Sequence, residues 1–243
     1  MPGETPDYGR LSAQATVFPV TDLGELGARL GSIVTHDRRG DVVWLDSFEE
    51  DLRKWVLGGS GVGNTVDLSR VRARNGFYSA RLVAGSDGSQ HANITHVQAF
   101  PAFSRMGFEF SFSYEDVLAS VELQVQLYDG VNRTVYRVRW VDTDNTIVYF
   151  DSSGNVVTLA TGVDLRRTLT LFHTIKLVVD ASAGEYVRLI LNETEYSMAG
   201  IAAQSVADSI APNFLIQIVN NGAGASNFPL YIDDVILTQN EPA

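Results

Sequence analysis

The sequence predicts an all-β protein in which two antiparallel sheets pack face to face as a sandwich. From Asp41 onwards, apolar and polar residues alternate with a period of two, which is typical of half-buried strands. Turn-forming stretches such as "DSSGN", "ASAGE" and "NNGAGASN" separate these runs. No helical pattern lies between them, and about a dozen strands joined without helices favour two packed sheets.

Length and composition favour one principal domain. The chain has 243 residues, of which 45% are hydrophobic, so it can bury a core. It contains no cysteine, which excludes disulfides and cysteine-based zinc or redox sites. The formal net charge of −11 opposes binding to nucleic acid, because polyanion binding depends on clustered lysines and arginines.

The chain divides near Gly40 into an N-terminal arm, residues 1–40, and a sandwich domain, residues 41–243. The arm begins as a polar stretch that lacks the basic and continuous apolar regions of a signal peptide. No part of the chain approaches the roughly 18 to 20 consecutive apolar residues of a membrane helix. We therefore expect no membrane partner.

A short helix is expected in the second half of the arm, within "TDLGELGARLG". Thr21 or Asp22 can cap its first turn, and Gly31 can end it. So short a helix is not stable alone, and its apolar face has to dock on the domain or on a neighbouring subunit. The residues expected to mediate this assembly are Leu23, Leu26, Arg29 and Leu30.

The strands of the domain follow in a regular order. The alternation is clearest in "FEFSFS" and "SVELQVQLYDG". The other expected strands are "VVWLDSF", "FYSARLVA", "TVYRVRWV", "TIVYFD", "VVTLA", "HTIKLVVD", "YVRLILN", "EYSM", "NFLIQIV" and "YIDDVIL". The side chains expected to face inwards are Phe108, Phe110, Phe112, Val121, Leu123, Val125, Ile175, Leu177, Phe214 and Ile216.

The glycine-rich stretch "GGSGVGNT", residues 58–65, shares only its glycines with a phosphate-binding loop. It lacks the Gly-Lys-Ser/Thr ending and a following helical pattern. We therefore expect a flexible loop at this point.

Three stretches together carry a resemblance to a known architecture. "GFYSARL", then "LFHTIKLVVDASAGEYVRLILNETEY" and the closing "YIDDVIL" resemble the concanavalin A-like jelly roll of laminin-G-like and carbohydrate-binding modules. The resemblance spans roughly Asp41 to Thr238, and Phe172 stands where a Trp often precedes the His of that strand. It implies a two-sheet antiparallel jelly-roll sandwich, an architecture that serves lectins, glycosidases, adhesion modules and viral structural proteins alike.

The resemblance implies that the first and last strands lie side by side, which suggests a metal site. Asp46 or Glu49 would then approach Asp233 or Asp234. Carboxylates brought together need a cation or a shared proton, and calcium takes about six to eight oxygen ligands. The alternative is that one Asp points to solvent while the other accepts backbone hydrogen bonds at a strand crossing. No cofactor is required by the sequence.

The sequence favours a protein that is not an enzyme. A retaining glycosidase on this fold would show a Glu-x-Asp-x-x-Glu strand that sets two carboxylates about 5 to 5.5 Å apart, and no such stretch occurs. The acidic residues of "YEDVLASVE", which include Glu122, are expected on a solvated face. The histidines lack metal-ligand spacing.

Carbohydrate binding is suggested by aromatic residues in "YRVRWVDTDNTIVYF". Tyr136, Trp140 and Tyr149 could form an exposed platform for a sugar ring. Tyr136 and Trp140 share one strand face, however, and large aromatic residues are usually buried, which favours a core position. Arg137 and Arg139 would then point outwards, towards a partner or into surface ion pairs.

The arm favours a role in assembly. It is similar to the arms with which bacteriophage virion proteins clasp neighbouring subunits. We therefore expect a non-enzymatic virion structural protein, either a capsid decoration or a tail-associated protein, made in the host cytoplasm and located in the virion. Its expected partners are other copies of itself and virion proteins such as the major capsid protein. The alternative is a carbohydrate-binding, lectin-like module that binds a surface glycan.

Overall fold

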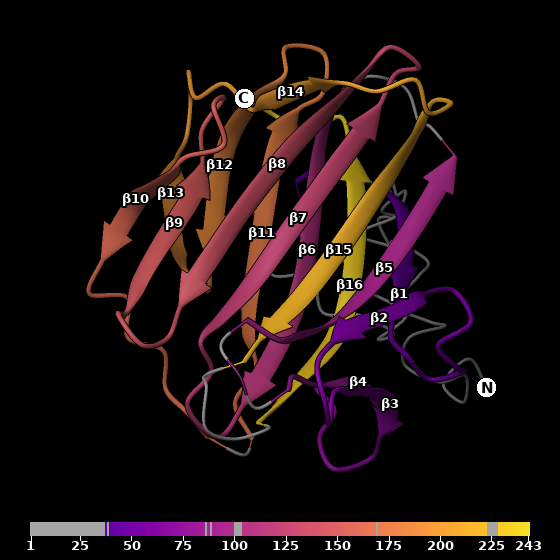
Figure 1. The fold of residues 1–243 in the computed structure, drawn as a ribbon, viewed down its shortest axis with the longest axis vertical. Coiled ribbons are helices and arrows are strands. Elements are labelled where there is room, and N and C mark those ends of the chain that lie inside the picture. The colour runs from indigo at the N-terminus through magenta and orange to yellow at the C-terminus, as the bar shows by residue number, and fades with distance from the viewer. Residues whose placement is uncertain are drawn as a thin grey trace, which may run out of the picture.

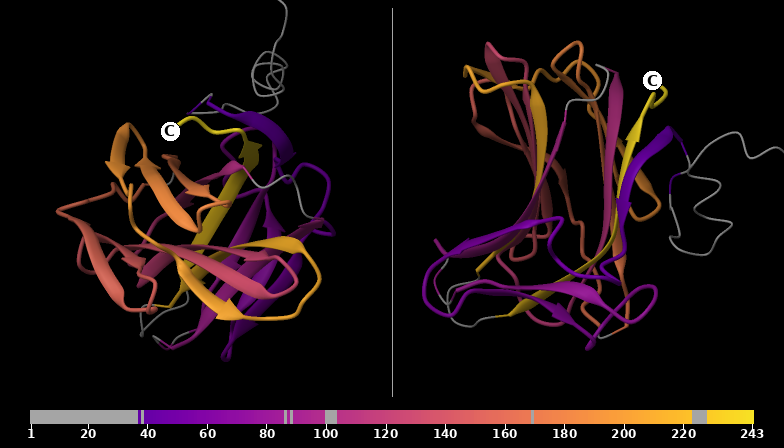
Figure 2. Two further views of the ribbon diagram at one scale, coloured as in Figure 1. Left: turned by 90° about the horizontal axis from the view of Figure 1, so that it is seen from above. Right: turned by 90° about the vertical axis from the view of Figure 1, so that its right-hand side faces the viewer.

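The computed structural model describes residues 37, 39–85, 87, 89–99, 104–168, 170–222 and 228–243. Within these ranges every regular element is a β-strand, and the strands form two antiparallel sheets packed face to face (Figures 1 and 2). The predicted all-β antiparallel sandwich is therefore confirmed. No helix long and apolar enough to span a membrane occurs in these ranges. The expected short helix lies outside the described residues, with Leu23, Leu26, Arg29 and Leu30.

Sheet A has eight strands in the order β13-β12-β11-β6-β16-β4-β3, with β1 also paired to β16. The bounds are β1 Asp41–Asp46, β3 Thr65–Ser69, β4 Ser79–Val83, β6 Arg105–Tyr114, β11 His173–Asp180, β12 Glu185–Leu191, β13 Thr194–Ser197 and β16 Pro229–Gln239. The first and last strands are neighbours as predicted, because β1 runs antiparallel to β16 with Asp46 opposite Val235.

Sheet B has eight strands in the order β10-β9-β8-β7-β15-β5-β2, with β14 paired to β8. The bounds are β2 Val56–Ser60, β5 His91–Ala99, β7 Ser120–Tyr128, β8 Asn132–Val141, β9 Thr146–Phe150, β10 Val156–Thr161, β14 Gln204–Ala207 and β15 Asn213–Asn221. The side view in Figure 2 shows that this sheet bends, with its outer face on the inside of the bend.

The expected flexible loop at residues 58–65 is wrong in its first half. Gly58 and Gly59 belong to β2, where they pair with Asn93 and Ala92 of β5. A Cβ on Gly59 would lie 2.7 Å from the carbonyl oxygen of His91, so the missing side chain lets the two strands approach. The glycines therefore serve strand pairing.

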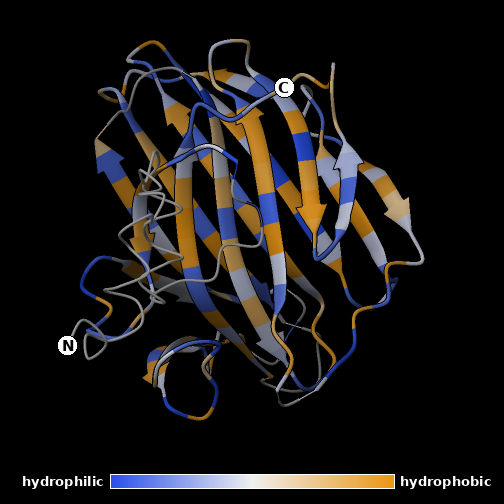
Figure 3. Ribbon diagram, turned by 180° about the vertical axis from the view of Figure 1, so that it is seen from behind, coloured by the Kyte–Doolittle hydropathy of each residue, from blue (hydrophilic) through white to orange (hydrophobic). Residues whose placement is uncertain are grey.

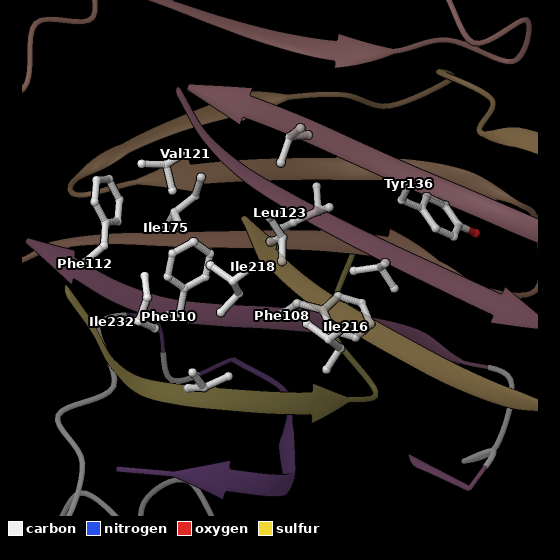
Figure 4. Close-up of a cluster of buried hydrophobic side chains, with 14 of the residues drawn as sticks. Phe108, Phe110, Phe112, Val121, Leu123, Tyr136, Ile175, Ile216, Ile218 and Ile232 are labelled. Atoms are coloured by element: carbon white, nitrogen blue, oxygen red, sulfur yellow. The ribbon is translucent and has the colours of Figure 1, made fainter. Parts of the chain in front are cut away.

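The core lies between the sheets and follows the predicted alternation. All ten side chains expected to face inwards are buried, including Phe110 and Leu123 at 1% exposure each (Figure 4). The view from behind in Figure 3 shows hydrophobic and hydrophilic residues alternating along the strands. Full burial of a large apolar side chain contributes about 1.5 to 3 kcal/mol relative to exposure, so this alternation is the main stabilising pattern of the domain.

Both ends of the described domain meet on the outer face of sheet A. Lys176 Nζ lies 3.1 Å from Asp37 Oδ2 and 2.6 Å from Glu241 Oε1. Glu241 Oε2 also lies 2.7 Å from Arg188 Nη2. Lys176, Arg188 and Glu241 are buried, so their charges are paired where water is excluded. The chain therefore enters the domain on the side opposite sheet B.

Candidate functional site

The residues expected to form a sugar platform lie on the inner face of sheet B. Tyr136 and Trp140 are both 0% exposed, and Tyr149 packs partly buried against the core. Their polar atoms are used inside the protein: Tyr136 Oη donates to Asp180 O at 3.1 Å, and Trp140 Nε1 donates to Val163 O at 3.0 Å. The platform interpretation is therefore wrong, and these rings fill the core.

A network of paired charges lies on the outer face of sheet B instead. Glu122 on β7 is directly opposite Arg139 on β8, and Arg137 is on the same face of β8. The Glu122 carboxylate accepts hydrogen bonds from Arg137 Nε and Nη2 at 2.8 and 3.0 Å. It also accepts from Arg139 Nε and Nη2 at 2.8 and 2.5 Å. Two positive charges therefore share one negative charge.

The burial of this network is uneven. The side chain of Glu122 is 4% exposed, whereas those of Arg137 and Arg139 are 30% and 28% exposed. The ring of Phe150 on β9 lies beneath them, with its centroid 4.0 Å from the guanidinium carbon of Arg137 and 5.4 Å from that of Arg139. Cation–π attraction and the shared carboxylate therefore hold two partly exposed guanidinium groups in fixed positions.

Uncharged polar side chains extend the face towards β15 and β5. Gln124 is opposite Gln217, which is in turn opposite Thr95. Gln217 Nε2 and Asn93 Nδ2 each donate a hydrogen bond to Thr95 Oγ1 at 3.3 Å. We call this outward set the sheet B face, and it consists of Asn93, Thr95, Glu122, Gln124, Arg137, Arg139, Phe150 and Gln217.

The expectation that Glu122 lies on a solvated face is wrong, because its side chain is 4% exposed and paired with two arginines. Arg137 and Arg139 do point outwards as expected, and they form ion pairs. The signal that could have identified the network is the short turn after Tyr128, because its length fixes which residue of β8 lies opposite Glu122. Alternation alone predicts the face of a residue but not its neighbour on the next strand.

The four carboxylates predicted as calcium ligands fall into two environments. Asp46 is buried beside Trp55, whose Nε1 donates a hydrogen bond to Oδ2 at 2.8 Å. Lys54 Nζ lies 3.2 Å from its other oxygen. Asp46 is thus satisfied by donors that follow it closely in sequence.

Glu49, Asp233 and Asp234 surround the loop of residues 74–78. Asp233 Oδ2 accepts hydrogen bonds from the backbone N of Arg74 and Asn75 at 2.7 and 3.3 Å. Glu49 Oε1 accepts from the backbone N of Phe77 and Tyr78, both at 2.9 Å. Part of this loop lines a cavity of about 310 Å³, together with Thr170 and Phe172. The carboxylates therefore fix the backbone of a cavity wall.

Asp234 is the least satisfied of the four carboxylates. Its Oδ2 accepts a hydrogen bond from Asn75 Nδ2 at 2.6 Å, while its Oδ1 has no hydrogen-bond partner. Burial raises the pKa of Asp234 to about 6, against the opposing effect of Arg74, whose Nη1 lies 3.5 Å from Oδ2. Burial and the adjacent Asp234 raise the pKa of Asp233 to about 7. The pair therefore retains protons near neutral pH when no cation is bound.

The calcium site stays a prediction. Asp233 accepts backbone hydrogen bonds as the alternative interpretation expected, but Asp234 is 1% exposed and does not point to solvent. Among the described residues, no group of three or more His, Cys, Asp or Glu side chains is placed to hold a metal ion. The unpartnered Oδ1 of Asp234 nevertheless marks a place where a cation or a proton would be stabilised.

The described histidines have structural partners. His173 Nε2 is 3.0 Å from Arg166 O, and Asn192 Nδ2 donates to His173 Nδ1 at 3.1 Å, so the ring is neutral with its proton on Nε2. Burial lowers the pKa of His173. His91 Nδ1 pairs with Ser60 Oγ at 3.0 Å. Among the described residues no carboxylate bonds to these rings, so none forms a hydroxyl–imidazole–carboxylate triad.

Comparison with known proteins identifies the architecture. No protein-family model and no curated protein matches the chain. A structure described as a carbohydrate esterase from Shiga toxin-encoding bacteriophage phi24B has a TM-score of 0.56 at 11% identity, covering 83% of this chain and 99% of that chain. An endo-β-1,4-glucuronan lyase from the fungus Trichoderma reesei has a TM-score of 0.55 at 11% identity, with coverages of 82% and 96%. A protein with a galectin-like fold from Bacillus subtilis has a TM-score of 0.51 at 11% identity, with coverages of 83% and 97%.

These likenesses define the class of fold, a jelly roll shared with galectin-like and other carbohydrate-related domains. They also correct the prediction that the chain is not an enzyme. That prediction rested on the missing paired-carboxylate strand of a retaining glycosidase. Two of the similar structures are named as an esterase and a lyase, which are reaction classes other than glycoside hydrolysis. The missing motif therefore excludes one mechanism, not catalysis on this fold.

Proposed function

We propose that the protein binds glycans through the sheet B face. The observation that carries this proposal is the network of Glu122, Arg137 and Arg139 above Phe150, at the centre of that face. Charged and amide groups held in place can exchange hydrogen bonds with sugar hydroxyls without first losing side-chain freedom. Planar guanidinium groups also offer a flat surface to a sugar ring.

Two further features support the proposal. The sheet B face lies on the inside of the bend of its sheet, where an elongated ligand can contact several strands at once (Figure 2). The similar structures include a galectin-like fold and proteins named as acting on carbohydrates. The sheet B face thus combines a concave shape with polar groups that can recognise a sugar.

The test is a binding measurement against a panel of neutral and acidic polysaccharides, by affinity electrophoresis followed by calorimetry. Gln124→Ala combined with Gln217→Ala removes two amide groups from the face while leaving the charges in place. We expect this variant to bind its best polysaccharide about tenfold more weakly. Thr65→Ala, at an exposed position in strand β3 of sheet A, is the control and should bind normally. Equal binding by all three proteins would rule out the face as the site.

Turnover is measured in the same incubations, through released acyl groups and new chain ends. Product formation would identify the bound polysaccharide as a substrate, and an unchanged polymer would identify it as a ligand. Both outcomes are compatible with binding at the sheet B face.

We also propose that residues 1–40 attach the domain to a neighbouring protein, as in a capsid decoration or tail-associated protein. The supporting observation is that Asp37 and Arg39 bond to Lys176 and Glu195 on sheet A, opposite the sheet B face. Attachment through this side would leave the sheet B face open to glycans. The virion location, the homo-oligomer and the major capsid protein as a partner stay predictions.

A further inference from the structure

We propose that the glycan bound at the sheet B face is anionic, and that the free edges of Arg137 and Arg139 bind its acidic groups. This inference rests on the proposed glycan binding and specifies the class of ligand. It is carried by the distribution of charge between the two sheets and by the geometry of the two guanidinium groups.

Sheet B is positive in a protein that is strongly acidic. Its eight strands contain one carboxylate and three arginines, namely Glu122, Arg133, Arg137 and Arg139. On the strands of sheet A, carboxylates outnumber lysines and arginines, and the whole chain carries −11. A positive face on such a protein does not follow from its composition, and its field attracts anions.

The local balance at the centre of the face is also positive. Glu122 neutralises one of the two guanidinium groups that it binds. One positive charge therefore remains on the two partly buried arginine side chains. Arg133, the third arginine, has its own carboxylate, because its Nε lies 3.9 Å from Asp208 Oδ2. The unbalanced charge therefore belongs to Arg137 and Arg139.

The guanidinium groups present unused donors beside this charge. Glu122 occupies Nε and Nη2 of each arginine, so the hydrogen bonds of the described residues leave both Nη1 groups free. A free guanidinium edge binds a carboxylate or sulfate through two parallel hydrogen bonds. Because Glu122 and Phe150 hold both groups in place, little side-chain freedom is lost when an anion binds.

Stability alone does not account for the second arginine. One arginine is sufficient to neutralise Glu122, and ion pairs with partly exposed partners contribute little to folding. The additional guanidinium group instead raises the positive charge of the face, which is the property that an anionic ligand requires.

The test measures binding of the intact chain to three polymers. Polygalacturonate carries carboxylates, dextran sulfate carries sulfates, and dextran is neutral. We expect at least one acidic polymer to bind about tenfold or more tightly than dextran at low salt, with an affinity that falls as sodium chloride is added. Whichever of the two acidic polymers binds more tightly identifies the acidic group that the site recognises.

Variants with equal charge changes separate a specific site from general attraction. Arg137→Gln and Arg139→Gln are each expected to weaken binding to the acidic polymer about tenfold and to weaken dextran binding by a smaller factor. Arg53→Gln makes the same change at a side chain that is 91% exposed outside the strands, and it should have little effect. Glu122→Gln increases the positive charge of the face and should preserve or strengthen binding. Circular dichroism checks that each variant is folded. The salt dependence is measured on the natural chain, so it tests the inference even where a variant fails to fold.

Three outcomes would overturn the inference, and they differ in whether the proposed glycan binding survives. Dextran binding as tight as that of both acidic polymers would remove the anionic class but keep glycan binding at the face. An equal loss with Arg53→Gln and Arg139→Gln would also remove it, because attraction would then be general. Absence of binding to any saccharide in the wider panel would remove the proposed function and the inference together.

Discussion

Asp233 and Asp234 follow each other in β16, yet both side chains are directed at the same loop. Neighbouring residues in a regular strand point to opposite faces. The register of β16 against β6 shifts between Asp233 and Ile236, and Asp234 has a φ of 50°. This bulge turns the second carboxylate towards the loop that the first one holds. The two acids are therefore buried together, which explains their raised pKa values.

The buried pair gives the metal-free protein a defined response to pH. The pKa values of Asp233 and Asp234 are raised to about 7 and about 6, above the usual value of about 4 in an unfolded chain. Between pH 4 and pH 7 the folded protein therefore holds protons that the unfolded chain has released. The free energy of unfolding contributed by this pair falls as the pH rises through this range. Urea denaturation at a series of pH values in the presence of a chelator measures the effect.

Asp234→Asn tests whether the pH dependence of stability comes from the Asp233–Asp234 pair. The amide can keep its oxygen towards Asn75, and Asn tolerates the positive φ at this position. We expect the variant to be more stable than the natural chain at pH 7 without metal, by about 1 to 3 kcal/mol, and to show a weaker dependence on pH. A variant that is less stable at pH 7 and retains the full pH dependence would contradict the assignment.

Calcium bound to this pair would reverse the pH dependence, so that the free energy of unfolding would rise with pH. A cation beside Asp234 Oδ1 would favour the ionised carboxylates and stabilise the native state by mass action. We expect added calcium to raise the melting temperature of the natural chain at pH 7, and chelation to lower it. Asp234→Asn should lose this response. An unchanged melting temperature after exhaustive chelation, with no metal by elemental analysis, would leave the proton as the stabilising partner.

At the scale of elements, the turn between β7 and β8 fixes the neighbours in the sheet B face. Asp129 Oδ1 accepts hydrogen bonds from the backbone N of Val131 and Asn132 at 2.7 and 2.6 Å. Asp129→Ala should therefore lower the free energy of unfolding by about 1 kcal/mol in urea denaturation. Asp116→Ala is the control and should cost less, because among the described residues its carboxylate accepts one backbone hydrogen bond, from Val117 N.

Polysaccharide binding should survive Asp129→Ala. The inward-facing side chains of β7 and β8 also hold the register, because a slip by one residue would expose the whole apolar set. A folded Asp129→Ala protein that no longer binds would show that the turn alone sets the register of the face.

The strands show how far the sequence predicts this fold. Period-two alternation identified the inward faces of β6, β7 and β15, because burial on one side dictates which residue types alternate. It did not identify β2, since Gly58 and Gly59 carry no side chain to show a period. It also could not bring Glu122 to Arg137 and Arg139, because that contact depends on how two strands pair. The site is therefore less visible in the sequence than the core.

At the scale of the whole molecule, stability depends on the apolar layer between the sheets. Phe110 is 1% exposed, and its ring centroid lies 5.9 Å from that of Phe112. Phe110→Ala should lower the free energy of unfolding by about 3 to 5 kcal/mol through the cavity that it leaves. Phe77→Ala removes the same atoms at a side chain that is 76% exposed, and it should cost less than about 1 kcal/mol. Equal losses in the two variants would contradict the two-sheet core.

A truncation experiment is expected to show that the domain folds without residues 1–36 and that these residues serve association. The core of the described protein lies within residues 41–243, and the last part of the arm reaches it through Asp37 and Arg39. A chain that lacks residues 1–36 keeps these two contacts, so it should remain soluble and unfold cooperatively. It should also lose self-association or attachment to a larger particle, because Leu23, Leu26 and Leu30 cannot bury themselves within one short helix.

Analytical ultracentrifugation and thermal denaturation measure both parts of this prediction, with Arg29→Gln in the full chain as a milder change. A single charge contributes little to association when its ion pair is exposed to water, so Arg29→Gln is expected to reduce association less than truncation does. If the full chain is monomeric at high concentration and the truncated chain fails to fold, residues 1–36 stabilise their own domain. The arm would then be an intramolecular strap, and the proposed attachment to neighbouring proteins would be wrong. Glycan binding at the sheet B face would be unaffected by that result, because the described arm residues Asp37 and Arg39 contact sheet A and the face belongs to sheet B.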